Sequence, residues 1–228
     1  MFWALRGGGA GSWGVIIDAT LPTLPIFNAT IHIVHVLTTT LDQTASLMTT
    51  HAKHISDWDQ VRAGQHFNLT GSTTNSTLVI STLFKDLDGD ASKAQMSSFL
   101  ADATKVGASV QGETTDTTFA NDIIGFPDDL SGYNAILSSR LVPGSVYSSA
   151  PGSVGPAYRQ LLSQGIRLVI GILVAGGAFH FRDVLWRYSK LMIHVGQVAA
   201  NADIDSAVNP AWRSAKTHVS ILPDTDIK

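Results

Sequence analysis

Glycine is concentrated near the start of the chain, where this residue type can bring a backbone close to a ligand. Eight consecutive positions, 7–14, contain five glycines: Gly7, Gly8, Gly9, Gly11 and Gly14. A backbone without Cβ atoms reaches conformations that other residues avoid, and it can approach a bound molecule closely. Residues 7–14, called the glycine segment below, are therefore a candidate binding loop.

The spacing of Gly9, Gly11 and Gly14 matches the G-x-G-x-x-G pattern of dinucleotide-binding folds. That pattern needs a helix directly after the turn and an acidic residue about twenty positions later. Here the β-branched run from Val15 to Pro22 predicts a strand that ends at proline, and no acidic residue lies between Asp18 and Asp42. These features argue against a nicotinamide site. The same strand argues against a serine nucleophile elbow at Ser12, which also needs a helix after the turn.

Taken by itself, the glycine segment is explained better by a tight structural turn than by a binding loop. Its neighbours add a resemblance to a known family. The run from Phe2 to Val15 resembles the end of the flavin-binding domain in the berberine-bridge-enzyme-like (PCMH-type FAD-binding), FAD-linked oxidases of fungi, and Trp13-Gly14-Val15 keeps their aromatic-Gly-Val/Ile step with Trp in place of the commoner Phe. A second run, Asp205–Arg213, resembles a substrate-domain segment of the same family. Two matches in the right order are stronger than either alone.

The resemblance implies two domains and a cofactor. Residues 1–25 would be the truncated end of an FAD-binding domain, and residues 26–228 a substrate-binding domain that is incomplete at its C-terminus. The expected cofactor is FAD, and the residues expected beside it, through their main chains, are Gly8, Gly9, Gly11, Ser12, Gly14 and Val15. Arg6 is a weaker candidate. The implied partners are a small-molecule substrate and oxygen.

The implied chemistry is removal of a hydride from an alcohol or amine carbon by FAD, with oxygen reoxidising the flavin. The substrate would be an alcohol, a sugar or a secondary metabolite. Relatives attach flavin through residues upstream and place catalytic groups near a segment downstream of the match at Trp212-Arg213, so no catalytic base is assigned to this chain. We therefore expect the 228-residue chain by itself to bind FAD weakly and to turn over little. The alternative is a noncatalytic α+β binding domain with a structural glycine turn.

Composition bounds the function further. The net charge is −3, the pI is about 6.2, and no Lys/Arg cluster dominates the chain, so we expect no nucleic-acid partner. Cysteine is absent, which excludes disulfides and thiolate metal sites. Charged residues make up 14%, against roughly 25% in ordinary soluble domains, while 44% of residues are hydrophobic, enough for a sizeable core.

Localisation is indicated only weakly. Three N-glycosylation sequons begin at Asn28, Asn68 and Asn75, which favours a secreted protein. No signal peptide precedes the glycine segment. The longest apolar run, Leu168 to Phe179, is shorter than the roughly twenty residues that cross a bilayer, so no membrane segment is expected.

Hydrophobic periodicity predicts alternating strands and helices. Strands are expected at Ile31–Leu37, at the pair Phe67–Thr70 and Thr77–Phe84, and at Leu168–Val174. Helices are expected at Leu41–Val61, around Ala94–Ala103 with Asp90 or Ser92 as the cap, and at Val154–Gln164. This order predicts an α+β fold: a large antiparallel sheet with helices on one face, preceded by the last strands of a flavin-binding domain.

Two regions fit this pattern less well. Residues 107–151 are polar and rich in turn residues, which predicts a loop, although Ser139–Pro143 resembles a family segment near the substrate cavity or its rim. Arg140 within it is expected to make a surface ion pair. Residues 178–197 interrupt the family pattern with aromatic and basic residues. Either a translated intron or a genuine amphipathic helix explains them equally well.

Candidate metal ligands are few. His51 and His54 are three residues apart on the predicted helix but lack a third ligand, so a solvated helix face is the favoured interpretation. His32 and His35 should point to opposite faces of their strand. Asp86, Asp88 and Asp90 imitate a calcium loop, yet Ala91 and Ser97 replace its Gly and Glu, which favours a helix cap. No metal is expected.

Overall fold

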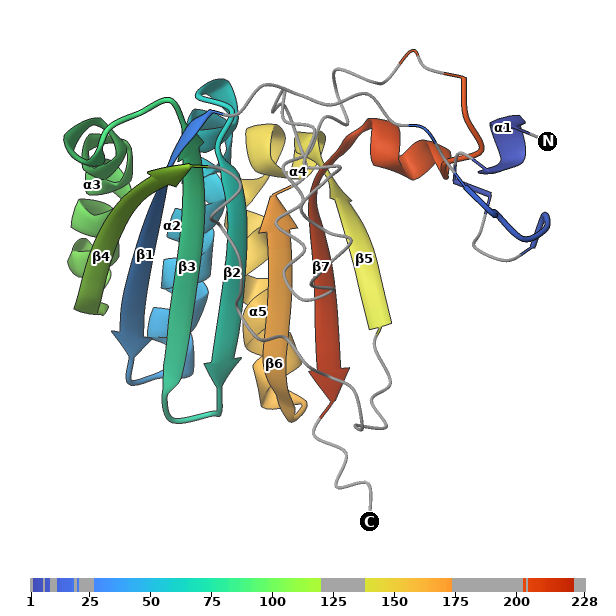
Figure 1. The fold of residues 1–228 in the computed structure, drawn as a ribbon. Coiled ribbons are helices and arrows are strands. Elements are labelled where there is room, and N and C mark those ends of the chain that lie inside the picture. Colours follow the sequence, from blue (N-terminus) through green and yellow to red (C-terminus); the bar gives the residue numbers. More distant parts are fainter. Residues whose placement is uncertain are drawn as a thin grey trace.

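Seven strands of the described residues form one sheet at the centre of the structure (Figure 1). The computed structural model describes residues 2–5, 7–8, 12–18, 20, 27–119, 138–173, 203 and 205–223. The strands are β1 (Asn28–Thr38), β2 (Gly64–Gly71), β3 (Ser76–Lys85), β4 (Ser109–Phe119), β5 (Ser138–Pro143), β6 (Ile166–Leu173) and β7 (Ala215–Pro223). Their order is β4-β1-β3-β2-β6-β7-β5, and every neighbouring pair is antiparallel.

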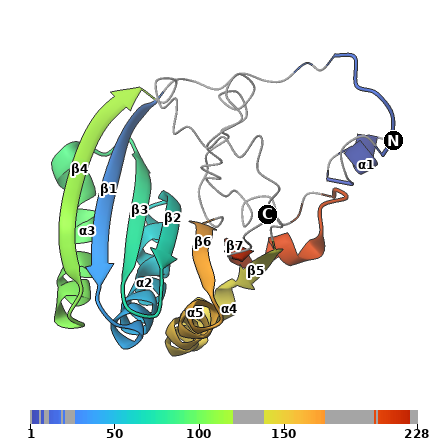
Figure 2. The ribbon, with the colours of Figure 1, turned by 90° about the horizontal axis from the view of Figure 1, so that it is seen from below.

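The helices that pack on this sheet lie on one of its faces (Figure 2). They are α2 (Leu41–Gln60), α3 (Gly89–Lys105), α4 (Gly144–Ser149) and α5 (Val154–Ser163). A short helix α1 (Phe2–Leu5) and two 3₁₀ turns, η2 (Pro151–Ser153) and η3 (Pro210–Arg213), complete the regular structure of the described residues. The predicted α+β architecture, a large antiparallel sheet with helices on one face, is confirmed.

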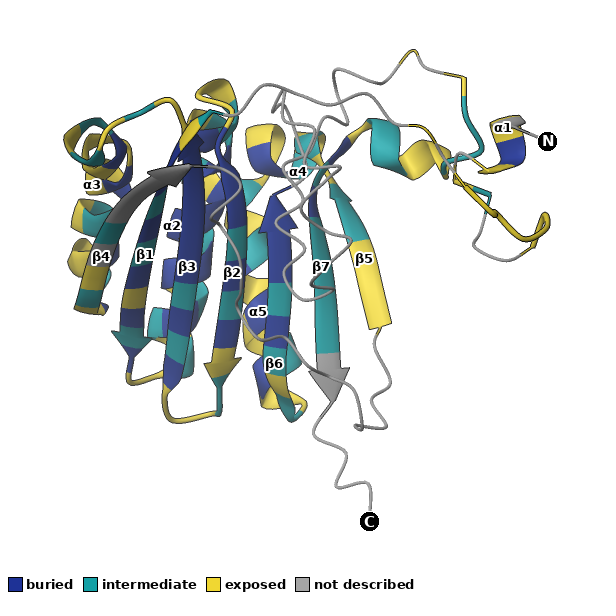
Figure 3. Ribbon diagram, viewed as in Figure 1, coloured by how far each residue is buried: buried dark blue, intermediate teal, exposed yellow. Residues whose placement is uncertain are grey.

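Alternation along the strands explains why one face carries the helices. Successive strand side chains point to opposite faces, so Val34 and Val36 of β1 face the helices while Ile33 and His35 face away. The register carries this pattern across the sheet, since Val34 pairs with Ile80 of β3. Figure 3 shows the resulting bands of buried residues along β1, β2 and β3. The side opposite the helices is called the far face below.

The core between sheet and helices is built around an aromatic cluster. Trp58 of α2, Phe99 of α3 and Phe67 of β2 are each at most 1% exposed. The ring centroids of Trp58 and Phe99 lie 5.5 Å apart in an edge-to-face arrangement, a geometry favoured by the aromatic quadrupole. Because this cluster joins two helices to the sheet, it fixes their relative positions.

Most predicted elements are confirmed, often with wider bounds. The strand at Ile31–Leu37 is β1, the helix at Leu41–Val61 is α2, and the strand pair is the β2–β3 hairpin. The helix at Val154–Gln164 is α5, and the strand at Leu168–Val174 is β6. The cap of α3 differs from the prediction: the Asp88 side chain, not Asp90 or Ser92, accepts a hydrogen bond from the Ala91 amide at 2.7 Å.

Two predictions about irregular segments are wrong. The described parts of residues 107–151, namely 107–119 and 138–151, are not a loop, because they contain β4, β5 and α4. The strand β4 was not predicted because its sequence is polar and rich in Thr. It pairs with β1 at the edge of the sheet, where a strand needs fewer apolar residues. The predicted strand after Gly14 is also not seen in its described part, since residues 14–18 have neither strand nor helix. The expected last strands of a flavin-binding domain are therefore not seen among the described residues before β1.

One glycine in β6 is required by the packing of the core. A Cβ atom at Gly171 would lie 1.9 Å from Cζ of Phe67, whose ring is 1% exposed. The two residues are paired across β2 and β6. Glycine at position 171 therefore makes room for the aromatic cluster.

We expect Gly171→Ala to lower the free energy of unfolding by about 2 kcal/mol, because the buried Phe67 ring must shift. Chemical denaturation followed by tryptophan fluorescence measures this change. Gly152→Ala is the matched control, since no atom lies within 4 Å of a Cβ atom built there. Equal stabilities of the two variants would contradict the packing role of Gly171.

Candidate functional site

The two segments that carry the family resemblance lie against each other in space. Trp3 Nε1 donates a hydrogen bond of 2.7 Å to Asp205 Oδ1, across 202 positions of sequence. Gly7 has a φ of +112°, and a Cβ atom there would lie 2.4 Å from Cγ2 of Val208. In Figure 1, α1 lies beside the segment that leads into η3. The residues around α1 and residues 205–213 are therefore one local unit, which sequence spacing alone does not reveal.

Residues 205–213 are ordered by their own hydrogen bonds. The Asn209 side chain accepts from the Ala211 amide at 2.9 Å and caps η3, whose first residue is Pro210. Arg213 donates to Ser206 Oγ at 3.0 Å. This compact turn leads directly into β7, so it connects the N-terminal residues with the sheet.

The predicted FAD-facing residues fall into three groups. Gly9 and Gly11, like Arg6, lie outside the described residues. Gly8 is used internally, because its amide donates to the Ala4 carbonyl at 2.8 Å and its own carbonyl accepts from Trp13 Nε1 at 3.0 Å. Ser12, Gly14 and Val15 are exposed.

An exposed apolar run follows the glycine segment. Val15 is 93% and Ile17 is 95% exposed, and the intervening Ile16 and preceding Trp13 are also largely exposed. Gly14, at a φ of +129°, has no atom within 4 Å of a Cβ position. Contiguous apolar residues with this exposure mark a surface that another group covers.

The far face of the sheet carries polar side chains among aliphatic ones. His66 of β2 pairs with Ser81 of β3 on one side and with Ile172 of β6 on the other, and Ile172 pairs with His218 of β7. Neighbouring strands lie about 4.8 Å apart, so the backbone positions of His66 and His218 are about 10 Å apart. Asn68 follows on the same face of β2. This row of His66, Asn68, Ser81 and His218 is called the far-face row.

Two members of the far-face row have unsatisfied polar atoms. In the described part of the chain, Ser81 Oγ and Asn68 Oδ1 are buried without a hydrogen-bond partner. Such groups are costly in a folded protein and call for a partner from another molecule or segment. The sequence patterns that predict the glycine segment do not reveal this row, because only the strand register brings it together.

The segment Ser139–Pro143, which resembles a family segment at the substrate cavity or its rim, forms most of β5. Its residues Ser139, Arg140 and Val142 do line a cavity. That cavity is bounded by α5, so it lies on the helix-covered face of the sheet. The expected surface ion pair of Arg140 is not seen among the described residues.

His51 is a core residue, which corrects the predicted solvated face. It is 2% exposed, its Nε2 lies 2.7 Å from Gln65 Oε1, and its ring packs on Phe67 with centroids 4.7 Å apart. Burial lowers the pKa of His51 from its ordinary 6.5 to about 4, against the opposing effect of the Gln65 hydrogen bond. His54 instead bridges two helices, with Nε2 3.2 Å from Asp102 of α3.

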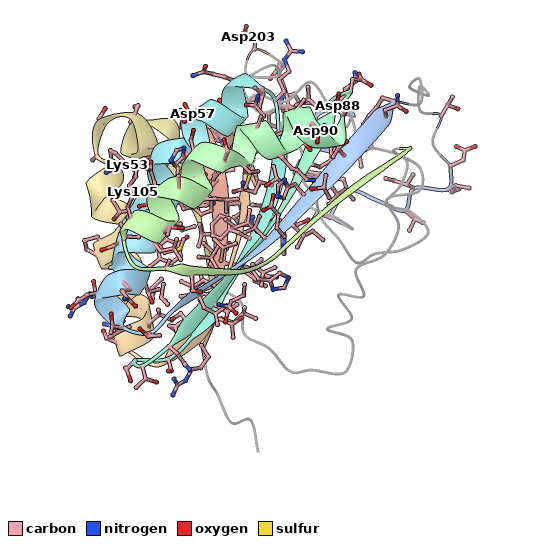
Figure 4. All side chains as sticks on the ribbon, turned by 90° about the vertical axis from the view of Figure 1, so that its left-hand side faces the viewer. Lys53, Asp57, Asp88, Asp90, Lys105 and Asp203 are labelled. Carbon is pink, nitrogen blue, oxygen red and sulfur yellow. The ribbon has the colours of Figure 1, made fainter. Side chains whose placement is uncertain are left out.

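The other ionisable candidates also have structural partners. His32 and His35 point to opposite faces of β1 as predicted, and the buried His32 lies 2.8 Å from Glu113 of β4. Burial lowers the pKa of His32, and the nearby Glu113 carboxylate partly opposes this. Figure 4 shows Asp88 and Asp90 at the start of α3 and Lys105 at its other end, the arrangement that a helix dipole favours. Within the described residues, no group of three His, Asp or Glu side chains is placed to hold a metal ion.

Comparison with known proteins supports the resemblance. No family model matches the chain. An uncharacterized FAD-linked oxidoreductase of Arthroderma benhamiae is 28% identical over all of this chain, which spans 38% of that protein's length. A VAO-type flavoprotein of Myceliophthora thermophila has the same fold over 99% of this chain and 38% of its own, with a TM-score of 0.67 and 14% identity. Berberine bridge enzyme, solved as a variant in complex with (S)-reticuline, matches over 99% of this chain and 42% of its own, with a TM-score of 0.63 and 10% identity.

The chain resembles the berberine-bridge-enzyme-like, FAD-linked oxidoreductases, in sequence through the Arthroderma protein and in fold through the solved flavoproteins. Its seven-stranded antiparallel sheet with helices on one face is a fold shared with these flavoproteins. The chain spans well under half the length of the relatives it matches. Among the described residues of this chain, no helix is long and apolar enough to cross a membrane.

Loss of the hydrogen bond between Trp3 and Asp205 should loosen the N-terminal residues of this chain. We expect Asp205→Ala to raise the rate of proteolytic cleavage within residues 7–18 several-fold, because a hydrogen bond to a carboxylate contributes on the order of 1 kcal/mol at an exposed site. Limited proteolysis followed by mass spectrometry measures the rate. Asp203→Ala is the matched control, since the exposed Asp203 has no hydrogen bond or ion pair among the described residues. The same cleavage rate in both variants would refute the role of Asp205.

The buried His51 predicts a loss of stability in acid. The unfolded chain takes up this proton near pH 6.5 and the folded protein only near pH 4, so the unfolded state binds more protons between these values. The free energy of unfolding therefore falls as pH falls through this window, by about 3 kcal/mol from this group. Denaturant midpoints measured from pH 7 to pH 4 test this. A His51→Gln variant should show a shallower pH dependence, and an unchanged slope would contradict the assignment.

Proposed function

We propose that this chain supplies the substrate-facing wall of an FAD-dependent oxidoreductase that oxidises a small alcohol, sugar or secondary metabolite, with oxygen as the final electron acceptor. In this proposal, residues 1–25 are the end of the FAD-binding domain and residues 26–228 belong to the substrate-binding domain. The sequence relative is named an FAD-linked oxidoreductase, which supports the cofactor. The cofactor supplies the hydride chemistry, so the protein needs mainly to position and shield the reactants.

The unsatisfied polar atoms of the far-face row are the observation that carries the proposal. Ser81 Oγ and Asn68 Oδ1 are buried but lack partners among the described residues, and aliphatic residues such as Ile172 lie between the polar ones. A substrate with hydroxyl groups on an apolar skeleton matches both features. Among the described residues, the helices cover the opposite face (Figure 2).

The residues proposed to hold FAD are those of the glycine segment and the apolar run after it. Ser12, Gly14 and Val15 offer exposed main-chain groups, while Gly9 and Gly11 are retained from the sequence prediction. Gly8 supports the turn rather than the ligand, because both its backbone polar groups have internal partners. Apart from Gly8, these residues would hold FAD through their main chains, and the cofactor would supply the hydride-transfer chemistry there.

Residues of the far-face row would orient the substrate and accept its proton. Oxidation of an alcohol releases the hydroxyl proton as the hydride leaves carbon, so a base near that hydroxyl assists the step. His66 and His218 are the proposed candidates, since an imidazole is the side chain that most often serves as a general base. Ser81 and Asn68 would hold the substrate hydroxyl groups by hydrogen bonds.

A secreted location is part of the proposal. Of the three sequons, Asn28 and Asn75 are exposed, and Asn75 lies in the turn between β2 and β3, where a glycan has room. Asn68 is half-buried on the far face and is a poor acceptor of a glycan.

The alternative function, a noncatalytic α+β binding domain with a structural glycine turn, is supported by the internal contacts of Gly7 and Gly8.

Titration with FAD separates these two functions. We expect saturable, weak quenching of flavin fluorescence when the chain is titrated into FAD, and at least a fivefold weaker affinity for Ile17→Asp, because a charge replaces a residue of the apolar wall. Ser145→Asp is the matched control, an exposed charge introduced on α4. A noncatalytic domain predicts no quenching, or quenching that neither variant changes.

The oxidase activity has its own test in protein loaded with FAD. Oxygen consumption is followed with a panel of small alcohols, sugars and amines. We expect His66→Gln to lower kcat at least tenfold with unchanged FAD retention, while Thr70→Ala, at the exposed end of the same strand, keeps the activity. Equal kcat values for His66→Gln and the parent protein would remove His66 from the mechanism.

A further inference from the structure

The cavity lined by Ser139, Arg140 and Val142 lies on the opposite side of the sheet from the far-face row. It has a volume of about 540 Å³ and is bounded by β5 and β7 on one side and by α4, η2 and α5 on the other. Many ligand sites have volumes of about 300 to 1,000 Å³, whereas a water molecule occupies about 30 Å³. The cavity is therefore large enough for an organic molecule and far larger than a packing defect.

The walls of this cavity are mainly apolar. Val142 of β5, Val219 and Ile221 of β7, and Val154 and Leu161 of α5 line it. These residues are only partly buried, although they pack against the hydrophobic core. A ligand with an apolar body would remove more of their surface from water, which is favourable.

One cation lies at the cavity, and no acid neutralises it among the described residues. Arg140 lines the cavity from β5, next to Ser138 and Ser139, and is itself exposed. Aspartate and glutamate are absent from the lining residues. A guanidinium group binds a carboxylate in a two-pronged geometry, so the charge of Arg140 favours an anionic ligand at this point.

A largely buried tyrosine lines the same cavity. Tyr158 of α5 is 6% exposed, and its hydroxyl makes no hydrogen bond to another of the described residues. Its neighbour Tyr147 is satisfied, since its hydroxyl bonds to Thr217 of β7. Burial raises the pKa of Tyr158, so this hydroxyl keeps its proton and can donate it to a ligand oxygen.

We propose that this cavity binds an aromatic carboxylic acid that carries a second oxygen, with its carboxylate at Arg140 and that oxygen at the Tyr158 hydroxyl. The aliphatic side chains and the tyrosine rings enclose the aromatic body. The site uses no residue of the far-face row or of the glycine segment, so it is independent of the proposed oxidoreductase function.

Binding of a hydroxynaphthoic acid, measured by its fluorescence with the complete chain, tests the proposal. We expect saturable binding that Arg140→Gln weakens about tenfold, because a charge-assisted hydrogen bond is lost. Arg159→Gln is the matched control: Arg159 also lies on the α5 side and pairs with Asp42, but it does not line the cavity, so affinity should stay unchanged.

Two simpler probes assign the contacts. Naphthol, which lacks the carboxylate, should bind the parent protein and Arg140→Gln equally. Naphthoic acid without the hydroxyl should bind the parent protein and Tyr158→Phe equally, while the hydroxynaphthoic acid should lose several-fold affinity in Tyr158→Phe. An absence of saturable binding to the parent chain, or binding that Arg140→Gln leaves unchanged, would overturn the proposal.

Discussion

Burial of a single face of the antiparallel sheet is the constraint on which the rest of the structure depends. The helix-facing side chains of β1, β2 and β3 join Trp58 and Phe99 in one core, and this fixes where α2 and α3 lie. Because strand side chains alternate, the same register sets the composition of the far face. A shift by one residue would bring Ser81 and Asn68 into the core and Phe67 out of it.

A second contact connects the ends of the described chain with this sheet. Trp3 and Gly7 pack on the segment around Asp205 and Val208, and that segment leads through η3 into β7. The exposed apolar run that follows the glycine segment is therefore connected to the sheet through these contacts. The two segments that carry the family resemblance, around α1 and at residues 205–213, therefore stabilise each other's position.

Sequence patterns predicted much of the fold and less of the site. The hydrophobic periodicity of α2 and the many β-branched residues of β1 allowed both elements to be predicted, because the residues they bury are apolar. The polar strand β4 escaped prediction because its position at a sheet edge relaxes the need for apolar residues. The glycine segment was visible as a motif, whereas the far-face row depends on pairing between strands far apart in sequence, such as β2 with β6. The irregular conformation of residues 14–18 shows that β-branched residues do not form a strand without a partner to pair with.

The proposed function depends on where FAD and its substrate contact this chain. Mapping of amide chemical shifts by NMR, with FAD added to the labelled protein, measures those contacts residue by residue. The account predicts that the largest shifts fall on residues 12–18 and that smaller ones reach Ser81 and Asn68 on the far face. Shifts confined to the helix-covered side of the sheet, or no shifts at saturating FAD, would contradict it.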